Sequence, residues 1–310
     1  MLEEGNIRIY ITESCNAKCP NCFNRTNRSD NSMDIDVFEK ICIYFQNNGI
    51  TNIKIMGGEP TIHPDFRQIT KIAQRHFKTV SIFTNAINDG ILNFSPRDTD
   101  SVIYNFKFAK ILNREKLLLD SDGRRSLEIQ ISSTTNIHKL KEDISRIIEI
   151  CGGTDVLHPC LTLDCTENIF EYRQTIVDKY EDIWKFCKDM GFSMGQDHLI
   201  PFCFIRDTNI PMPKGGAICR LSCAGLIDSS YNIKFCNQFS DVSMPLFEDG
   251  NFIPFEKYTS FLNRQYAMLT SLSANKGCST CSMREIMCNG GCFASKDFIL
   301  AKDLCKYKIE

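Results

Sequence analysis

Short apolar segments that predict β-strands alternate with helical patterns up to Met190, and this alternation limits the possible folds more than any other feature. The expected strands are residues 7–11, 52–56, 79–84, 101–108, 126–132 and 156–164. Between them, apolar residues recur at helical spacing. They are Phe38, Ile41, Cys42 and Phe45, then Phe66, Ile69, Ile72 and Ala73, then a stripe within residues 137–150, and within residues 169–190 Ile176, Tyr180, Ile183 and Phe186. Strands that alternate with helices form a parallel sheet with right-handed crossovers. The sequence therefore predicts an α/β protein.

A cysteine-bearing loop follows the first predicted strand. Cys15, Cys19 and Cys22 are separated by three and by two residues. A [4Fe–4S] cluster normally takes four cysteines, so three leave one iron open. An open coordination position allows a metal to act chemically on a ligand. The alternatives are a zinc site, because cysteines two residues apart often bind zinc, or buried free thiols.

The second predicted strand ends in Gly57-Gly58-Glu59-Pro60. Glycines let the backbone approach a ligand closely, a carboxylate suits an ammonium group, and proline restricts the turn. Polar residues also follow the third and fifth strands, at Asn85 and Ser132. The alternatives are an ordinary strand–helix turn and an ordinary turn asparagine.

Both motifs, in this order and each after a strand, resemble the signature motifs of the radical SAM enzymes. The resemblance implies a partial (β/α)6, TIM-like barrel, with the active site at the C-terminal strand ends. In that family the open iron binds S-adenosylmethionine (SAM), and one electron cleaves it to methionine and a 5′-deoxyadenosyl radical that takes a hydrogen atom from the substrate. It implies that Cys15, Cys19 and Cys22 hold the catalytic cluster. It also implies that the cofactor contacts are Gly57, Gly58, Glu59, Pro60, Phe23, Asn85 and Ser132.

One detail of the cluster loop differs from the family pattern. The family usually has an aromatic residue directly before the third cysteine, where it leans on the adenine. This chain has Asn21 there, and the aromatic Phe23 comes one residue after Cys22.

The last part of the chain is rich in cysteine. Residues 201–310 hold nine of the 17 cysteines, and eight of these form a framework: Cys219, Cys223, Cys236, Cys278, Cys281, Cys288, Cys292 and Cys305. This framework resembles the SPASM extension of radical SAM enzymes, with two auxiliary [4Fe–4S] clusters and thus three clusters in all. The resemblance assigns Cys219, Cys223, Cys236 and Cys292 to one cluster, and Cys278, Cys281, Cys288 and Cys305 to the other. Two structural zinc sites are the alternative.

Two details of this framework differ from the family pattern. The gap between Cys281 and Cys288 is one residue longer than usual, and the glycine expected before Cys236 is absent. We predict a radical SAM barrel over residues 1–200 and a small auxiliary-cluster domain over residues 201–310. The remaining cysteines are expected to be buried thiols: Cys42, Cys151, Cys160, Cys165, Cys187 and Cys203.

The resemblance implies a radical SAM oxidoreductase that modifies a ribosomal peptide by crosslinking, thioether formation or another oxidation. Eight cysteines favour two fully ligated clusters, which suits electron removal. The alternatives are a dehydrogenase or epimerase of a small molecule such as an aminoglycoside, an iron–sulfur electron carrier, and a zinc-stabilised binding module. An electron donor of the flavodoxin or ferredoxin type is expected. Because the first strand begins near Asn6, a leader peptide would need a separate binding protein, unless the substrate is short or not a peptide.

Composition sets further limits on the protein. A chain of 310 residues with 43% hydrophobic residues is long enough for one large or two ordinary domains. A net charge of −2 shows no excess of basic residues of the kind that binds nucleic acid. No apolar run reaches membrane-spanning length. The N-terminus does not resemble a signal peptide, so the many cysteines predict a reduced cytoplasmic location and metal binding.

Overall fold

The computed structural model of the chain contains two compact units, each built from an earlier and a later stretch of the sequence. The first comprises Met1–Ser126 and Arg220–Ala267, and the second comprises Leu127–Cys219 and Met268–Glu310. The structure describes residues 5–19, 22, 29–105, 124–151, 157–164, 167, 169–196, 200–211, 223–236, 242–271, 278, 280–283 and 288. The predicted division at residue 200 was made by motif rather than by compactness, and it stays a prediction.

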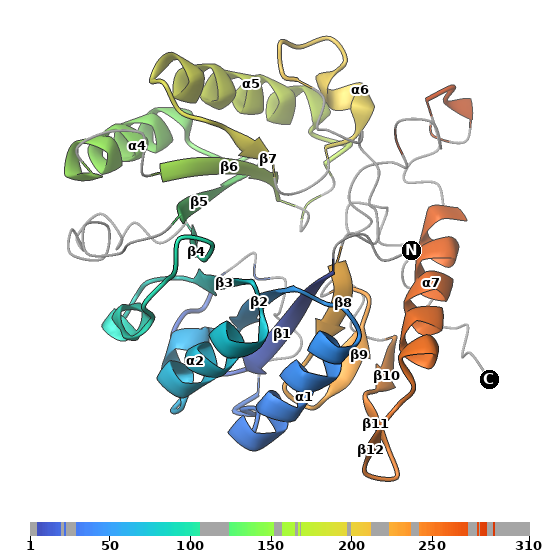
Figure 1. Cartoon of the computed structure of the whole chain (residues 1–310). Helices are drawn as coiled ribbons and strands as arrows, with labels where there is room; N and C mark the ends of the chain where they lie inside the picture. The colour runs from blue at the N-terminus through green and yellow to red at the C-terminus, as the bar shows by residue number, and fades with distance from the viewer. Residues whose placement is uncertain are drawn as a thin grey trace. The chain divides into compact units, whose positions relative to one another are not determined.

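The first unit is organised around a mostly parallel sheet (Figure 1). Its strand order is β10-β9-β8-β1-β2-β3-β4. The parallel strands are β1 (Asn6–Thr12), β2 (Asn52–Gly57), β3 (Thr79–Thr84), β4 (Ser101–Asn105) and β8 (Cys223–Ile227). Antiparallel strands β9 (Asn232–Lys234) and β10 (Ser243–Pro245) extend the sheet beyond β8.

Helices fill the crossovers between the parallel strands of this unit. They are α1 (Ile35–Asn47), the 3₁₀ turn η1 (Pro60–Ile62), α2 (Phe66–His76) and the 3₁₀ turn η2 (Asp89–Asn93). Figure 1 shows α1 and α2 side by side, and the two helices are in contact. A small hairpin of β11 (Phe247–Glu248) and β12 (Asn251–Phe252) precedes α7 (Phe255–Ser271), and the Phe252 ring stacks on Tyr44 of α1 at 4.6 Å.

The bounds of α1 follow from capping and from an apolar stripe. The Asp34 carboxylate accepts hydrogen bonds from the amides of Asp36 and Val37, which have no partner inside the helix. The predicted stripe of Phe38, Ile41, Cys42 and Phe45 is buried. Gly49 follows the helix with φ +81°, a backbone conformation that glycine adopts without a steric penalty. The sequence prediction for this helix is confirmed.

The second unit continues the alternation of strand and helix. It contains most of β5 (Arg124–Ile131), then α4 (Ile137–Cys151), β6 (Leu157–Leu163), α5 (Arg173–Asp189), β7 (Gly195–Gln196) and the short helix α6 (Phe202–Ile205). The order of its strands is β5-β6-β7, and β6 pairs with β7 in parallel. The predicted sixth strand therefore forms despite Pro159.

The observed elements differ from the predicted ones in bounds rather than in type. The fourth strand ends at Asn105, and the predicted residues 106–108 lie outside the described part. Helix α5 begins at Arg173 rather than at residue 169, and Trp184 and Cys187 are buried where Phe186 was expected. Strands β8–β12 were not predicted, because each has five residues or fewer. Helix α7 was missed, although Tyr258, Phe261 and Leu262 lie at helical spacing and are buried.

The α/β prediction with a parallel sheet is confirmed. In each unit the strand order is open, so the described strands form no closed barrel, which agrees with the predicted partial barrel. A search of the described helices finds none that is both long and apolar enough to span a membrane.

Hydrogen bonds to Asp100 link the start of β3 to the turn before β4. Its fully buried carboxylate accepts hydrogen bonds from the Val80 amide at 2.8 Å, from Gln74 Nε2 at 2.8 Å, and from Arg97 Nε and Nη2 at 3.0 and 2.9 Å. Burial by itself would raise the pKa of Asp100. The donors, led by Arg97, outweigh burial and leave the pKa below its usual value of 3.8.

Replacing Asp100 with asparagine should destabilise the protein by about 3 kcal/mol, because Arg97 then loses its buried partner. This is the low end of the range for such pairs, since the Arg97 side chain is 39% exposed. Because the folded pKa is lowered, the stabilisation is complete above the usual pKa of 3.8 and is lost as the pH falls through the folded value. Urea unfolding at neutral pH and at successively lower pH should therefore show the two proteins converging in acid. A difference that stays constant would contradict this role.

Candidate functional site

Three segments of the first unit meet where the neighbouring parallel strands β1, β2 and β3 end. Thr12 of β1 pairs with Gly57 of β2, so the cysteine loop and the Gly57–Pro60 turn begin at the same level. The Gly58 amide donates to the Thr12 carbonyl at 2.8 Å, and the Glu59 amide donates to the Ser14 carbonyl at 2.9 Å. The turn is therefore bonded directly to the loop that carries Cys15, Cys19 and Cys22.

The two glycines of the turn are required by this close packing. A Cβ atom on Gly57 would lie 2.4 Å from the Thr12 carbonyl oxygen. On Gly58 it would lie 2.2 Å from the Ser14 carbonyl oxygen and 2.5 Å from that of Glu13. Real Cβ atoms essentially never come so close to backbone, so any side chain here would displace the cysteine loop. The glycines thus make room for the loop.

The Glu59 carboxylate joins the ends of β2 and β3 from a buried position. The residue is 1% exposed. Oε1 accepts from the Thr61 hydroxyl at 2.6 Å, the Thr61 amide at 3.2 Å and the Thr84 hydroxyl at 2.8 Å, and Oε2 accepts from the Asn85 amide at 2.7 Å. Burial raises the pKa of Glu59, while the four hydrogen bonds act in the opposite direction.

Replacing Glu59 with glutamine should destabilise the first unit by about 1.5–3 kcal/mol, the value of one hydrogen bond to a charged group. The new amide nitrogen would face hydrogen-bond donors, so at least one contact is lost. Denaturant unfolding is the measurement. Glu39→Gln is the matched control, because Glu39 is partly exposed and its ion pair with Arg75 lies at the surface. Equal effects of the two substitutions would refute the role of Glu59.

Asn85 lies against the cysteine loop, as expected for a residue at the C-terminal end of β3. Its side-chain amide donates to Asn16 Oδ1 at 2.9 Å and contacts Cys15 Sγ at 3.9 Å, while its Oδ1 accepts from the Ile87 amide at 2.9 Å. The Ala17 amide also donates to Cys15 Sγ, at 3.4 Å. Nitrogen–hydrogen groups that face a sulfur favour its thiolate form.

Residues that the sequence analysis did not identify support the start of the loop from the other side. The Glu13 amide donates to the Asn31 carbonyl at 2.8 Å, and the buried Glu13 carboxylate accepts from the Ser229 hydroxyl at 3.4 Å. The Tyr231 hydroxyl accepts from the Asp34 amide at 3.3 Å. These hydrogen bonds connect the turn between β8 and β9 to the cysteine loop. The two segments are about 200 residues apart, so the sequence gives no sign of this contact.

Tyr10 of β1 presents a buried hydroxyl that has no hydrogen-bond partner among the residues that the structure describes. Its ring is 2% exposed and packs with Met56, Leu226 and Phe83. Burial raises the pKa of the phenol well above its usual value, and negative charge on Glu13 and then Cys236 raises it further. An unsatisfied buried donor costs about 1–3 kcal/mol, so a bound group that accepts this hydrogen bond would be favoured.

The loop fits an iron–sulfur cluster by its donor chemistry. Three cysteines lie within eight residues, and two nitrogen–hydrogen groups face Cys15 Sγ. The phenol of Tyr10, which no described residue pairs with, lies on the strand that leads into the loop. Thiolates are the ligands of such clusters, and hydrogen bonds to sulfur tune them. Among the residues that the structure describes, no three His, Cys, Asp or Glu side chains are already grouped to hold a metal ion.

The other two predicted cofactor residues are Ser132 and Phe23. Ser132 follows β5 in the second unit, where its hydroxyl lies 3.0 Å from that of Thr135. Phe23 lies outside the described residues. The roles predicted for both stay predictions.

The predicted auxiliary ligands are divided between the two units. Cys223 begins β8 and Cys236 follows β9 in the first unit, while Cys278, Cys281 and Cys288 belong to the second. Cys219, Cys292 and Cys305 lie outside the described residues. The predicted pairing of these cysteines into clusters is therefore still a prediction.

The unassigned cysteines are not all deeply buried. Cys42 and Cys187 are buried as predicted, and burial raises the pKa of Cys187 to about 12. Cys160 and Cys203 are only half-buried, because β6 carries Cys160 beside the short strand β7 and Cys203 lies on the short helix α6. Cys165 and the side chain of Cys151 lie outside the described part.

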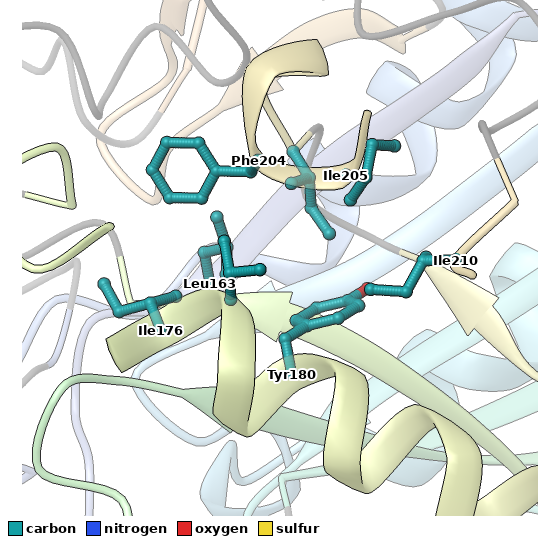
Figure 2. Close-up of a pocket in the computed structure, with 8 residues that line it drawn as sticks. Leu163, Ile176, Tyr180, Phe204, Ile205 and Ile210 are labelled. Carbon is teal, nitrogen blue, oxygen red and sulfur yellow. The ribbon is translucent and has the colours of Figure 1, made fainter. Parts of the chain in front are cut away.

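A small apolar pocket, with room for little more than a water molecule, lies in the second unit. Figure 2 shows Phe204 and Ile205 of α6 facing Leu163 of β6 and Tyr180 of α5 across it. Within the described part of the chain, the Tyr180 hydroxyl is the single polar side-chain group of the pocket lining, and no hydrogen-bond partner is found for it there. One hydroxyl provides neither an acid–base pair nor a metal-ligand set, so the candidate catalytic site is the strand edge of the first unit.

Comparison with known proteins agrees with this location. Residues 9–103 match the Radical SAM superfamily. The subtilosin biosynthesis protein AlbA of Bacillus subtilis is 21% identical over 206 residues, which cover 56% of this chain and 46% of AlbA. A probable GTP 3′,8-cyclase of Methanococcus maripaludis strain C5 is 30% identical over 64% of this chain and 60% of the cyclase. The chain thus matches about half of AlbA and three fifths of the cyclase.

Solved structures share the fold over almost the whole chain. SuiB of Streptococcus suis bound to precursor peptide SuiA has a TM-score of 0.69 and 17% identity over 98% of this chain and 73% of SuiB. The structure of anSMEcpe with bound AdoMet and Kp18Cys peptide has a TM-score of 0.62 and 15% identity, over 97% of this chain and 99% of that one. The matched residues 9–103 contain the cysteine loop, the Gly57–Pro60 turn and Asn85. The chain therefore carries a radical SAM domain over residues 9–103, which include the candidate site.

Proposed function

We propose that this protein is a radical SAM enzyme that modifies a peptide. The observation that carries the proposal is the bonding of the cysteine loop to the Gly57–Pro60 turn and to Asn85 at one sheet edge. When bound, the [4Fe–4S] cluster and SAM supply a 5′-deoxyadenosyl radical that removes a hydrogen atom from the substrate. Cys15, Cys19 and Cys22 hold that cluster.

The chain's own residues fix the position of the loop and of the cofactor. Gly57 and Gly58 allow the turn to lie against the loop, so backbone groups of the turn are available to the SAM amino group. The Glu59 carboxylate is occupied by four donors, and it therefore acts on SAM by setting the turn in place. Asn85 orients Cys15 and Asn16. Phe23 and Ser132 complete the proposed cofactor contacts.

A peptide substrate is favoured by the relatives. AlbA takes part in the biosynthesis of the bacteriocin subtilosin, SuiB was solved with a precursor peptide, and anSMEcpe was solved with the Kp18Cys peptide. A small molecule is the second candidate, and the similarity to GTP 3′,8-cyclases is the observation in its favour. Both peptide-bound structures share the fold over at least 97% of this chain.

The cysteine framework of residues 219–305 is proposed to hold two auxiliary [4Fe–4S] clusters of the SPASM type. Four protein thiolates for each cluster leave no open iron, so these clusters serve to remove an electron rather than to bind substrate. A flavodoxin- or ferredoxin-type donor would supply the first electron, and a separate protein would present the leader peptide. The reaction is expected to take place in the cytoplasm.

The test is an anaerobic reaction of the reconstituted protein with SAM, a reductant and candidate precursor peptides encoded beside its gene. Chromatography coupled to mass spectrometry should detect 5′-deoxyadenosine and a peptide that has lost two hydrogen atoms. Cleavage of SAM without any modified peptide, but with a modified small molecule, would favour the second candidate. Zinc in place of iron would refute the proposal.

A further inference from the structure

The sheet of the first unit has one face along which α1 and α2 lie (Figure 1) and an opposite face that is less buried. Side chains alternate between the two faces of a strand. In β1, β2 and β3, the residues Ile9, Ile55 and Ile82 are fully buried. Several residues that alternate with the buried ones are only half-buried: Arg8, Lys54, Phe83, Ser101 and Ile103. The opposite face therefore remains partly accessible to a bound group.

Two basic side chains lie next to each other on this opposite face. Arg8 of β1 pairs directly with Lys54 of β2 in the register of the sheet. The same row continues with Ser81 of β3 and Ser101 of β4, whose hydroxyl oxygens lie 2.8 Å apart. Like charges directly opposite each other destabilise a pair of strands. An anion bound at this row would reduce the repulsion.

The surroundings of Lys54 leave its charge without a carboxylate. Its ammonium lies 5.8 Å from the centroid of the Phe83 ring, and no described acidic side chain forms an ion pair with it. Lys234 of the same unit is different, because its ammonium lies 2.7 Å from the Asp228 carboxylate. A charge that is partly removed from water costs free energy unless it is paired. Lys54 therefore favours an anionic ligand.

The Tyr10 phenol is a second and independent observation on the same face. The residue is 2% exposed, and its hydroxyl has no hydrogen-bond partner in the described part of the chain. Phe83 packs against the cluster that Tyr10 forms with Met56 and Leu226, and the Lys54 ammonium lies over the same Phe83 ring. A buried donor without a partner favours a ligand that can accept its hydrogen bond. A carboxylate satisfies both the ammonium and the phenol.

We propose that Lys54 and Tyr10 bind a carboxylate of the substrate, so that the enzyme selects a peptide with an acidic group near the residue that it modifies. This inference rests on the proposed function, because it takes the substrate to be a peptide. Lys54 lies three residues before Gly57, which places it about 10 Å from the strand edge at 3.3 Å per residue. An extended peptide covers that distance in about three residues. The acidic group should therefore lie within about three residues of the modified one.

The first experiment measures binding of small probes to the full, iron-loaded chain by ligand-observed NMR. N-acetylglutamate α-amide carries a side-chain carboxylate, N-acetylalanine carries a terminal carboxylate, and N-acetylglutamine α-amide is the neutral control. A carboxylate probe should bind and the neutral one should not, and the tighter of the two carboxylates identifies the source. If neither carboxylate binds more tightly than the neutral probe, the inference is overturned, whatever chemistry the enzyme performs.

Substitutions test whether the two side chains act on the ligand or on the fold. Lys54→Met should weaken binding of the carboxylate probe at least about tenfold, and Tyr10→Phe should weaken it as well. Both variants should keep the midpoint of urea unfolding at or above that of the wild type, because each removes a group that lacks a partner. Lys71→Met is the matched control, since Lys71 is exposed on α2. A lower midpoint with unchanged probe binding would make Lys54 a structural residue and refute the inference.

A modified precursor peptide extends the test to the reaction. Replacing its acidic residues one at a time with asparagine or glutamine, or amidating its C-terminus, should raise KM at one position only. That change should have little further effect in Lys54→Met, because the partner of the carboxylate is already absent. An equal rise of KM in both proteins would contradict the contact. Failure to cleave SAM would instead overturn the proposed function, and the binding of the probes would still be decided by the first experiment.

Discussion

Replacing Cys15, Cys19 and Cys22 together with alanine should abolish the formation of 5′-deoxyadenosine. A cluster with one open iron needs its other three irons held by protein, and these are the cysteines of the loop that the Gly57–Pro60 turn supports. The iron content should fall by about four per chain while the remaining iron stays bound. Quantitative mass spectrometry of the nucleoside and a parallel iron assay provide the two measurements.

Cys42→Ala is the control for this triple substitution. Cys42 is fully buried on the apolar face of α1, so its loss should affect stability but not cluster content. If the triple variant still cleaves SAM at the wild-type rate, the catalytic cluster is held elsewhere.

Replacing Gly58 with alanine should remove most of the iron from the catalytic cluster, even though no ligand is changed. The added methyl group would lie 2.2 Å from the Ser14 carbonyl oxygen, directly before Cys15. The obstacle is backbone rather than a flexible side chain, so the loop itself must move. SAM binding, measured by calorimetry on the reconstituted variant, should weaken at least tenfold, since a shift of the loop disturbs both the cluster and the turn.

Gly250→Ala is the matched control for the glycine substitution. Gly250 has φ +77°, but a Cβ atom there meets nothing within 4 Å. The substitution should cost about 1 kcal/mol of backbone strain and leave the iron content unchanged. Equal iron loss in the two variants would mean that Gly58→Ala acts through general instability rather than through the loop.

Much of the fold could be predicted because periodicity is a local property. The stripe Phe38, Ile41, Cys42 and Phe45 and the cap at Asp34 fix α1 from residues close in sequence. The pairing of strands that are far apart in sequence could not be predicted in this way. Strand β8 has only five residues and lies beside β1, more than 200 residues earlier, and no local pattern indicates that neighbour.

The candidate site also has a part that could be predicted from sequence and a part that could not. The cysteine loop, the Gly57–Pro60 turn and Asn85 follow strands, and parallel strands bring their C-terminal ends to one edge, so their meeting could be predicted. The partners of Glu59 could not, because they depend on the directions of the Thr61 and Thr84 side chains. Tyr10, Glu13 and Ser229 were missed because their importance comes from burial, which an isolated residue type does not show.

The pairing of β8 with β1 also affects any attempt to cut the chain at residue 200. A fragment that ends there would retain β1 but lose β8, which is its hydrogen-bonded neighbour on the side away from β2. The exposed edge would consist of Ile7, Ile9, Ile11 and their neighbours, an apolar strand with unpaired backbone groups. Such edges template pairing between molecules, so the fragment should aggregate rather than behave as an independent barrel.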